Sequence, residues 1–164
     1  MPTEAELAAL YSSLRRRYFW AGDGRGCLLP PAGEVAIEWS TRLTASAGVC
    51  YPGKRLIRLS THYHRRFPDE VESTLLHEMI HLIVPGHGPA FRAWIERIRS
   101  LGGSVNRFAR EPARPPRWVY VCPSCGRRFP RQRRLPGGGR RYRCRACGPG
   151  AGPLQERGPL PPRA

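Results

Sequence analysis

Apolar residues recur at helical spacing near the start of the chain. They are Leu7, Leu10, Tyr11, Leu14 and Tyr18. Positions three or four apart share one face of a helix, so this pattern predicts a helix with a single apolar face. Thr3 and Glu6 have the spacing of a capping box, which predicts that the helix begins beside them.

Shorter apolar runs follow, with the alternation typical of strands. Residues 35–39 and 55–59 alternate between apolar and polar positions, and residues 48–51 form another short run. Pro52-Gly53 lies between the last two runs and predicts a turn. Together these segments predict a small antiparallel sheet.

Two more helices are expected after the strands. Residues 71–83 include seven apolar side chains, and Pro85 ends this helix because the residue before a proline disfavours the helical conformation. Pro89 suits the first turn of the next helix, which Gly102-Gly103 ends. Three helices and a small sheet predict an α+β domain over residues 1–109.

Composition divides the rest of the chain. Residues 110–117 are rich in Pro and Arg and are expected to be a linker. Residues 118–148 contain two C-x-x-C pairs and are expected to form a separate zinc ribbon. Residues 149–164 are rich in Pro and Gly, which predicts a disordered tail.

The chain is strongly basic. Its 164 residues have a formal net charge of +16 and a pI of 11.0, and Lys54 is the only lysine. A GC-rich genome explains arginine in place of lysine, but not the excess of basic over acidic residues. A charge of this size indicates a polyanionic partner, most simply nucleic acid.

The sequence also bears on location. No segment has the ~18 uninterrupted apolar residues that a membrane span needs. Residues 1–6 lack the basic and apolar regions of a secretory signal. We therefore expect a cytoplasmic, monomeric protein with no membrane partner.

Residues 77–81 form an H-E-x-x-H motif. His77 and His81 are four residues apart on one helical face, so both imidazoles can reach one ion. Glu78 lies about 100° around the helix from His77, where it can accept a proton from a zinc-activated water. His87 is the expected third ligand, with Pro85-Gly86 supplying the turn. The alternative is that these histidines are hydrogen-bonded residues of a partly buried helix and bind no metal.

The four cysteines of the ribbon are Cys122, Cys125, Cys144 and Cys147. Eighteen residues separate the two pairs, which is the spacing of a four-cysteine structural zinc site. Disulfides are the alternative, and reducing cytosolic conditions disfavour them.

Most of the excess charge lies around these cysteines. Residues 107–147 contain thirteen arginines and one acid, with Trp118, Phe129 and Tyr142 among them. Arginines beside aromatic rings favour phosphate contact and base stacking. The expected nucleic-acid contacts are Arg127, Arg128, Arg131, Arg133, Arg134, Arg140, Arg141 and Arg143. The alternative is a solvated charged surface that keeps a small module soluble.

Several segments in combination resemble a known family. They are residues 37–40, 47–50, 58–60, 75–81 and 86–91. Together with the terminal ribbon they resemble the SprT-like family over residues 3–148. The resemblance implies a zincin-like metalloprotease with His77, His81 and His87 as zinc ligands and Glu78 as the catalytic base. It also implies substrates of the kind found in DNA–protein crosslinks.

The leading hypothesis is thus a zinc endopeptidase acting on nucleic-acid-bound proteins, with one catalytic and one structural zinc. DNA is the expected nucleic acid. The rival hypothesis is a non-catalytic nucleic-acid-binding zinc protein, and a third is a protease that associates with RNA or ribosomes.

Overall fold

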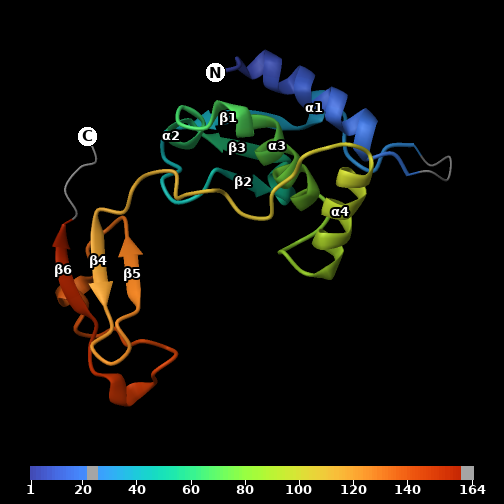
Figure 1. The fold of residues 1–164 in the computed structure, drawn as a ribbon. Helices are drawn as coiled ribbons and strands as arrows, with labels where there is room; N and C mark the ends of the chain where they lie inside the picture. The colour runs from blue at the N-terminus through green and yellow to red at the C-terminus, as the bar shows by residue number, and fades with distance from the viewer. Residues whose placement is uncertain (22–25, 160–164) are drawn as a thin grey trace. The chain divides into compact units, whose positions relative to one another are not determined.

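The chain divides after Ala113 into two units, which the computed structural model describes over residues 1–21 and 26–159 (Figure 1). Unit 1 is Met1–Ala113 and unit 2 begins at Arg114. The division falls within residues 110–117, where the Pro-rich sequence offers few side chains that could join a core.

Helix α1 spans Glu4–Tyr18 and begins at the expected capping box. The Glu6 backbone N–H donates to Thr3 Oγ1 (3.2 Å), and the Thr3 N–H donates to Glu6 Oε2 (2.7 Å). These two bonds satisfy N–H groups that a helix start leaves unpaired. The helix buries Leu7, Tyr11 and Leu14 on one face, as the apolar spacing predicts.

The sheet of unit 1 contains β1 (Ala36–Ser40), β2 (Gly48–Tyr51) and β3 (Leu56–Ser60), in the order β1-β3-β2. Strand β2 is antiparallel to β3, but β1 is parallel to β3. The prediction of an antiparallel sheet was therefore wrong for β1. The short turn between β2 and β3 makes these two strands a hairpin. The direction of β1 instead depends on burying Ile37 with Ile57, two residues far apart in the sequence, so no local pattern predicts it.

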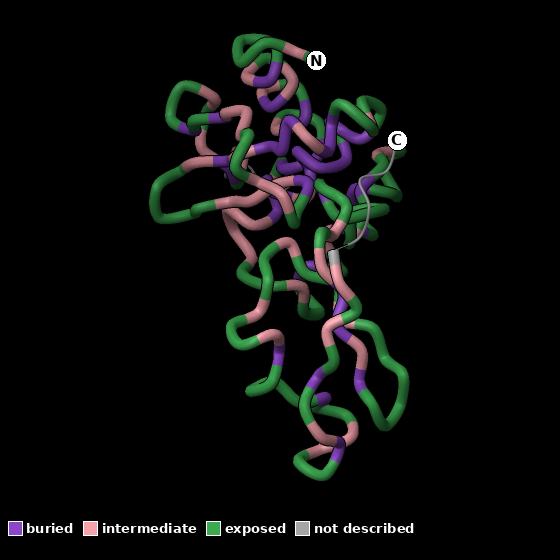
Figure 2. The backbone as a smooth tube through the Cα atoms, turned by 90° about the vertical axis from the view of Figure 1, so that its left-hand side faces the viewer, coloured by how far each residue is buried: buried purple, intermediate pink, exposed green. Residues whose placement is uncertain are grey.

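Helices cover one face of this sheet. Ile57 and Leu59 are fully buried in a core shared with α1 and with α3 (Val71–His81) and α4 (Pro89–Ser100). Figure 2 shows buried positions gathered in this part of unit 1. The alternate residues Glu38 and Arg58 form a half-exposed ion pair (3.0 Å). A short helix α2 (Thr61–His64), which the sequence did not predict, precedes α3. Among the helices in the described ranges, none is long and apolar enough to cross a bilayer.

Unit 2 is a three-stranded antiparallel sheet in the order β5-β4-β6. Its strands are β4 (Trp118–Val121), β5 (Arg128–Arg131) and β6 (Gln155–Pro159). Strand β6 lies in the segment that the sequence predicted to be disordered. It is held by buried Leu154 and by Glu156, which accepts a hydrogen bond from Tyr120 (2.9 Å). Residues 160–164 of that predicted tail lie outside the described residues.

Candidate functional site

Three histidines converge at the C-terminal end of α3. His77 and His81 project from adjacent turns of the helix, and His87 lies on the loop that follows. The Nε2 atoms are 3.2 Å apart for His77 and His81, 3.2 Å for His81 and His87, and 2.9 Å for His77 and His87. Each of the three residues therefore offers one nitrogen to a common point.

The hydrogen bonds of the other ring nitrogens favour metal binding. His77 Nδ1 lies 2.8 Å from the Asn106 carbonyl, and His81 Nδ1 lies 3.1 Å from the Val84 carbonyl. A carbonyl only accepts, so each Nδ1 carries the proton and each Nε2 keeps a lone pair. Lone pairs that face one another are satisfied by a cation. An ion about 2.1 Å from each nitrogen, the usual zinc–imidazole distance, fits among nitrogens so spaced.

The loop after α3 brings His87 back to the helix. Gly86 has a φ of 69°, a left-handed conformation that glycine adopts without a steric penalty. The expected turn at Pro85-Gly86 is thus present, although Val84 occupies the place where a glycine often permits such a turn. The ring of Phe91 packs beneath all three imidazoles, with centroids 4.7 to 4.8 Å away. This packing limits how far the imidazoles can rotate.

Burial keeps two of the histidines neutral. It lowers the pKa of His77 to about 4, and it also lowers the pKa of His87. A neutral imidazole is the form that binds metal, so burial favours the metal-binding form of these two residues.

Glu78 lines the same cleft as the three histidines and is 5% exposed. Burial raises the pKa of its carboxyl to about 8, and the backbone N–H of Cys50 counteracts part of that effect. A carboxylate with a raised pKa is a stronger proton acceptor than an exposed one. Its position depends on Gly48, because a β-carbon there would lie 2.8 Å from Glu78 Oε1 and 3.0 Å from Thr74 Cγ2.

The histidines and Glu78 open into a cleft of about 820 Å³. One face of α3 forms its floor. The lining side chains on that face are Ser73, Thr74, His77, Glu78 and His81. One side is strand β2 and the residues before it, and the other is the segment Asn106–Pro112. In the described part of unit 1, β2 is an edge strand, and its residues Gly48, Val49 and Cys50 line the cleft.

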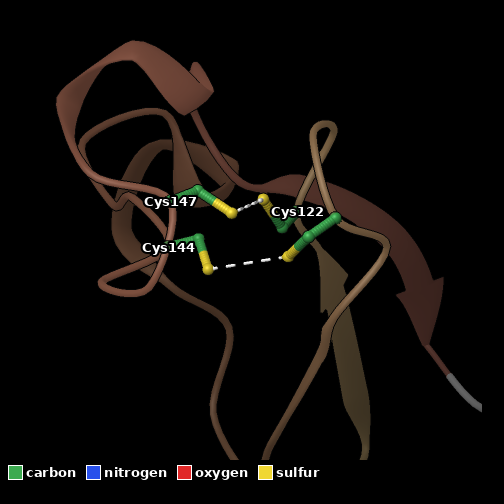
Figure 3. A group of neighbouring side chains, drawn as sticks. Cys122, Cys144 and Cys147 are labelled. Carbon is green, nitrogen blue, oxygen red and sulfur yellow. Dashed lines mark hydrogen bonds between the residues drawn. The ribbon is translucent and has the colours of Figure 1, made fainter.

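The four cysteines of unit 2 also converge. Their Sγ atoms all lie within 4.8 Å of one another, and every one is a free thiol. Cys122 Sγ is 4.0 Å from Cys147 Sγ, and Cys125 Sγ is 3.8 Å from Cys144 Sγ. Figure 3 shows Cys122 and Cys147 facing each other, with Cys144 pointing into the same space. Tetrahedral zinc with 2.3 Å bonds separates its sulfurs by about 3.8 Å, whereas a disulfide needs about 2.05 Å.

Both cysteine pairs use the same turn. Gly126 N–H donates to Cys122 O, and Gly148 N–H donates to Cys144 O, each at 3.0 Å. These glycines have φ values of 69° and 72°, a left-handed conformation that suits glycine. Backbone N–H groups of the turn, first that of Cys125, lower the pKa of Cys122 to about 7. Thiolate, the form that binds zinc, is therefore favoured at Cys122, whereas hydrogen bonds with the Cys125 and Cys144 thiols raise the pKa of Cys147 to about 12.

All eight arginines predicted to contact nucleic acid are exposed in unit 2. Some of them also make contacts within unit 2. Arg134 pairs with Glu156 (3.0 Å) and lies over the ring of Trp118. The Arg143 guanidinium donates to the Arg140 backbone carbonyl (2.9 Å), which holds the Arg143 side chain near the Arg140 backbone.

Sequence reasoning missed several residues around the histidines. One is Gly48, which lies against Glu78. Another is Ser73, whose Oγ accepts a hydrogen bond from the Asn106 N–H (3.1 Å), and the Asn106 carbonyl in turn accepts a hydrogen bond from His77. Arg107, which was counted only toward the basic charge of residues 107–147, donates to the His87 carbonyl (3.0 Å). Only Gly48 carried a signal, as part of a segment shared with the SprT-like family.

Two family descriptions match successive parts of the chain. Residues 7–111 match the SprT-like family, and residues 116–154 match the SprT-like zinc ribbon domain. The second match extends six residues beyond the ribbon boundary expected from the sequence, toward β6.

Individual relatives agree with these matches. The DNA-dependent metalloprotease SPRTN of Homo sapiens is 34% identical over 113 residues, which are 60% of this chain and 21% of that protein. The DNA-dependent metalloprotease dvc-1 of Caenorhabditis elegans is 32% identical over 116 residues, 60% of this chain and 29% of that protein. Protein SprT-like of Lactiplantibacillus plantarum is 37% identical over 81 residues, 47% of this chain and 52% of that protein. The chain thus spans about a fifth of the length of the human relative.

Proposed function

The chain belongs to the SprT-like family, and from this premise we propose that it is a zinc-dependent endopeptidase that cleaves nucleic-acid-bound proteins. One observation carries the proposal: three imidazole nitrogens converge beside a buried carboxylate at the floor of an open cleft. Three protein ligands with room for a fourth are typical of catalytic rather than structural zinc. The four-cysteine cluster has no such vacancy, which supports a structural zinc there.

His77, His81 and His87 would hold the zinc ion, which would supply a Lewis acid to polarise the peptide carbonyl and to lower the pKa of water. Glu78 accepts the proton of the attacking water as the new C–O bond forms. It then delivers that proton to the leaving amine as the C–N bond breaks. Burial suits Glu78 to both tasks, because its raised pKa lies near neutrality.

The cleft suits an extended polypeptide. The floor from Ser73 to His81 is about 12 Å long at 1.5 Å per residue, which matches three or four residues of extended chain. The outer edge of β2 offers backbone groups that can pair with such a segment. Folded proteins do not expose segments of this kind widely, so we expect cleavage in unfolded or loosely folded regions.

The exposed arginines of unit 2 support nucleic acid as the second partner, with DNA as the expected form. Arg140, Arg141 and Arg143 lie close together in the sequence beside exposed Tyr142. This combination suits phosphate contact and base stacking. The names of the human and nematode relatives, which describe DNA-dependent proteases, point the same way. Cytoplasmic location and a monomeric state stay predictions.

Binding assays test this part of the proposal. Replacing Arg140, Arg141 and Arg143 by Gln should weaken binding to single-stranded DNA and reduce the salt dependence by about one counterion per lost phosphate contact. The matched control replaces three exposed arginines of unit 1, Arg42, Arg65 and Arg92. Equal losses in both variants would show that net charge, not the ribbon surface, governs binding. Duplex DNA and RNA in the same assay identify the preferred partner.

Cleavage assays test the rest. The zinc-loaded chain should cleave a basic DNA-bound protein, and faster when single-stranded DNA is present. A chain that holds zinc and binds DNA but cleaves no unfolded or DNA-bound protein is instead the non-catalytic nucleic-acid-binding protein.

A further inference from the structure

The segment Asn106–Pro112, here called the strap, is tied to the histidine site at its start. The Asn106 carbonyl accepts the Nδ1–H of His77 (2.8 Å), and its N–H donates to Ser73 Oγ (3.1 Å). Arg107 Nη2 donates to the His87 carbonyl (3.0 Å). The first two strap residues therefore contact two of the three converging histidines.

The strap is also fixed further along. The Arg110 N–H donates to the Tyr63 hydroxyl (3.0 Å), and the Arg110 guanidinium pairs with Asp69 (2.9 Å) and with buried Glu70. Arg66 pairs with Glu111. Phe108 lies between these two sets of anchors, so the backbone that carries it is held on both sides.

Phe108 itself is 68% exposed, although it is aromatic and borders the cleft. Its ring centroid lies 6.0 Å from the ring centroid of His87. The guanidinium carbon of Arg107 lies 5.0 Å from the same Phe108 centroid. Single exposed apolar residues are common, and Leu101, which is 47% exposed outside the cleft, is one of them. The position of Phe108 beside a candidate metal ligand, on an anchored backbone, sets it apart.

We propose that Phe108 determines substrate specificity, by contacting an apolar side chain on a residue that flanks the scissile peptide bond. The inference rests on the proposed endopeptidase function. Successive residues of an extended substrate are about 3.4 Å apart. A residue next to a carbonyl placed at the three Nε2 atoms is therefore within reach of a ring 6.0 Å from His87.

The chemistry of the contact favours leucine, methionine or an aromatic residue at that position. An aromatic face gains from burying apolar surface and gives no hydrogen bond to a carboxylate. Discrimination by a single apolar contact is typically about tenfold or somewhat more. Base stacking by Phe108 on a nucleotide is the competing use of the same ring.

Peptide binding to the zinc-loaded full chain tests the proposal without requiring turnover. The protein carries Glu78→Gln, and the peptides are fluorescent Gly/Ser octamers with one central Leu, Phe or Asp. We expect the Leu and Phe peptides to bind about tenfold more tightly than the Asp peptide. Adding Phe108→Ala should bring that ratio of affinities close to one. Phe108→Leu should lower the ratio only slightly, and Leu101→Ala should leave it unchanged.

The assignment is overturned if no peptide binds, or if the Phe108→Ala variant keeps the same ratio of peptide affinities. If that variant keeps the ratio and also loses affinity for single-stranded DNA, the Phe108 ring is assigned to a base instead. Cleavage of the same peptides by the unmodified chain separates the two proposals. If the ratio of peptide affinities depends on Phe108 but no peptide is cleaved, only the endopeptidase function is contradicted. If peptides are cleaved but the preference among them does not depend on Phe108, only the role of Phe108 is contradicted.

Discussion

Gly48 lies directly against Glu78: a β-carbon at position 48 would approach Glu78 Oε1 to 2.8 Å and Cγ to 2.9 Å. Real β-carbons essentially never lie this close to an atom to which they are not bonded. The strand that borders the cleft therefore also determines where the carboxylate can lie. A glycine on β2 and a glutamate on α3 act together although thirty residues separate them.

Substitution of Gly48 by Ala should displace Glu78 and leave the histidines in place. We expect zinc content close to that of the unmodified chain and a fall in kcat of about a hundredfold, because small displacements of a catalytic group have effects of that size. Gly53→Ala is the matched control, since no atom lies within 4 Å of its added β-carbon. Normal kcat in Gly48→Ala would show that the carboxylate does not need this position.

Ser73 supports the site from one step further away. Its hydroxyl accepts the backbone N–H of Asn106, the residue whose carbonyl accepts the proton of His77. Ser73→Ala should weaken zinc binding by roughly tenfold, the lower end of the range for partners of metal ligands. Competition with a chromophoric chelator measures this directly, with Ser100→Ala on exposed α4 as the control. Equal zinc affinities would indicate that Phe91 and Val84 suffice to orient the rings.

Much of this arrangement could not be predicted from the sequence. Local signals were reliable: the capping box at Thr3, the H-E-x-x-H spacing and the paired cysteines depend only on neighbours within a few residues. The parallel pairing of β1 and the pairing of β6 with β4 depend on distant partners. The same holds for Gly48 against Glu78 and for the Asn106 carbonyl at His77. Such contacts form only when the core brings the segments together.

The stability of the metal-free chain should fall as the pH rises. The folded chain keeps a proton on Glu78 up to a pKa of about 8, whereas the unfolded chain releases it near 4.5. The unfolded state therefore binds fewer protons in this window, and raising the pH destabilises the fold by up to about 5 kcal/mol. Urea unfolding followed by far-UV circular dichroism reports α1, α3 and α4, all in unit 1.

Glu78→Gln isolates this contribution. The histidines whose pKa values burial lowers act in the opposite direction below pH 6.5, but they are present in both proteins and cancel in the difference. We expect the Gln variant to gain stability relative to the unmodified chain from pH 5 to pH 8. Parallel pH profiles would mean that Glu78 is not buried in a protonated form.

The ribbon should depend on its metal for folding. The buried residues of its core cluster are Tyr120, Cys122, Cys144, Ala151 and Leu154, and two of these five are candidate ligands. So small a core does not hold a fold without a metal or another crosslink. Cys144→Ser should make the arginines of unit 2 sensitive to trypsin and leave the helical circular dichroism of unit 1 unchanged. Cys27→Ser in unit 1 is the control, and a protease-resistant ribbon in Cys144→Ser would contradict the structural role.

The most direct test of the account compares cleavage by the unmodified chain and by Glu78→Gln, each with its zinc content measured. The substrate is a basic DNA-binding protein on single-stranded DNA. We predict that both proteins hold two zinc ions per chain, that the unmodified chain cleaves the substrate, and that Glu78→Gln is slower by a factor of about 10² to 10⁴. Equal cleavage by both zinc-loaded proteins, or none by either, would contradict the assignment of Glu78 as the catalytic base of a metalloprotease.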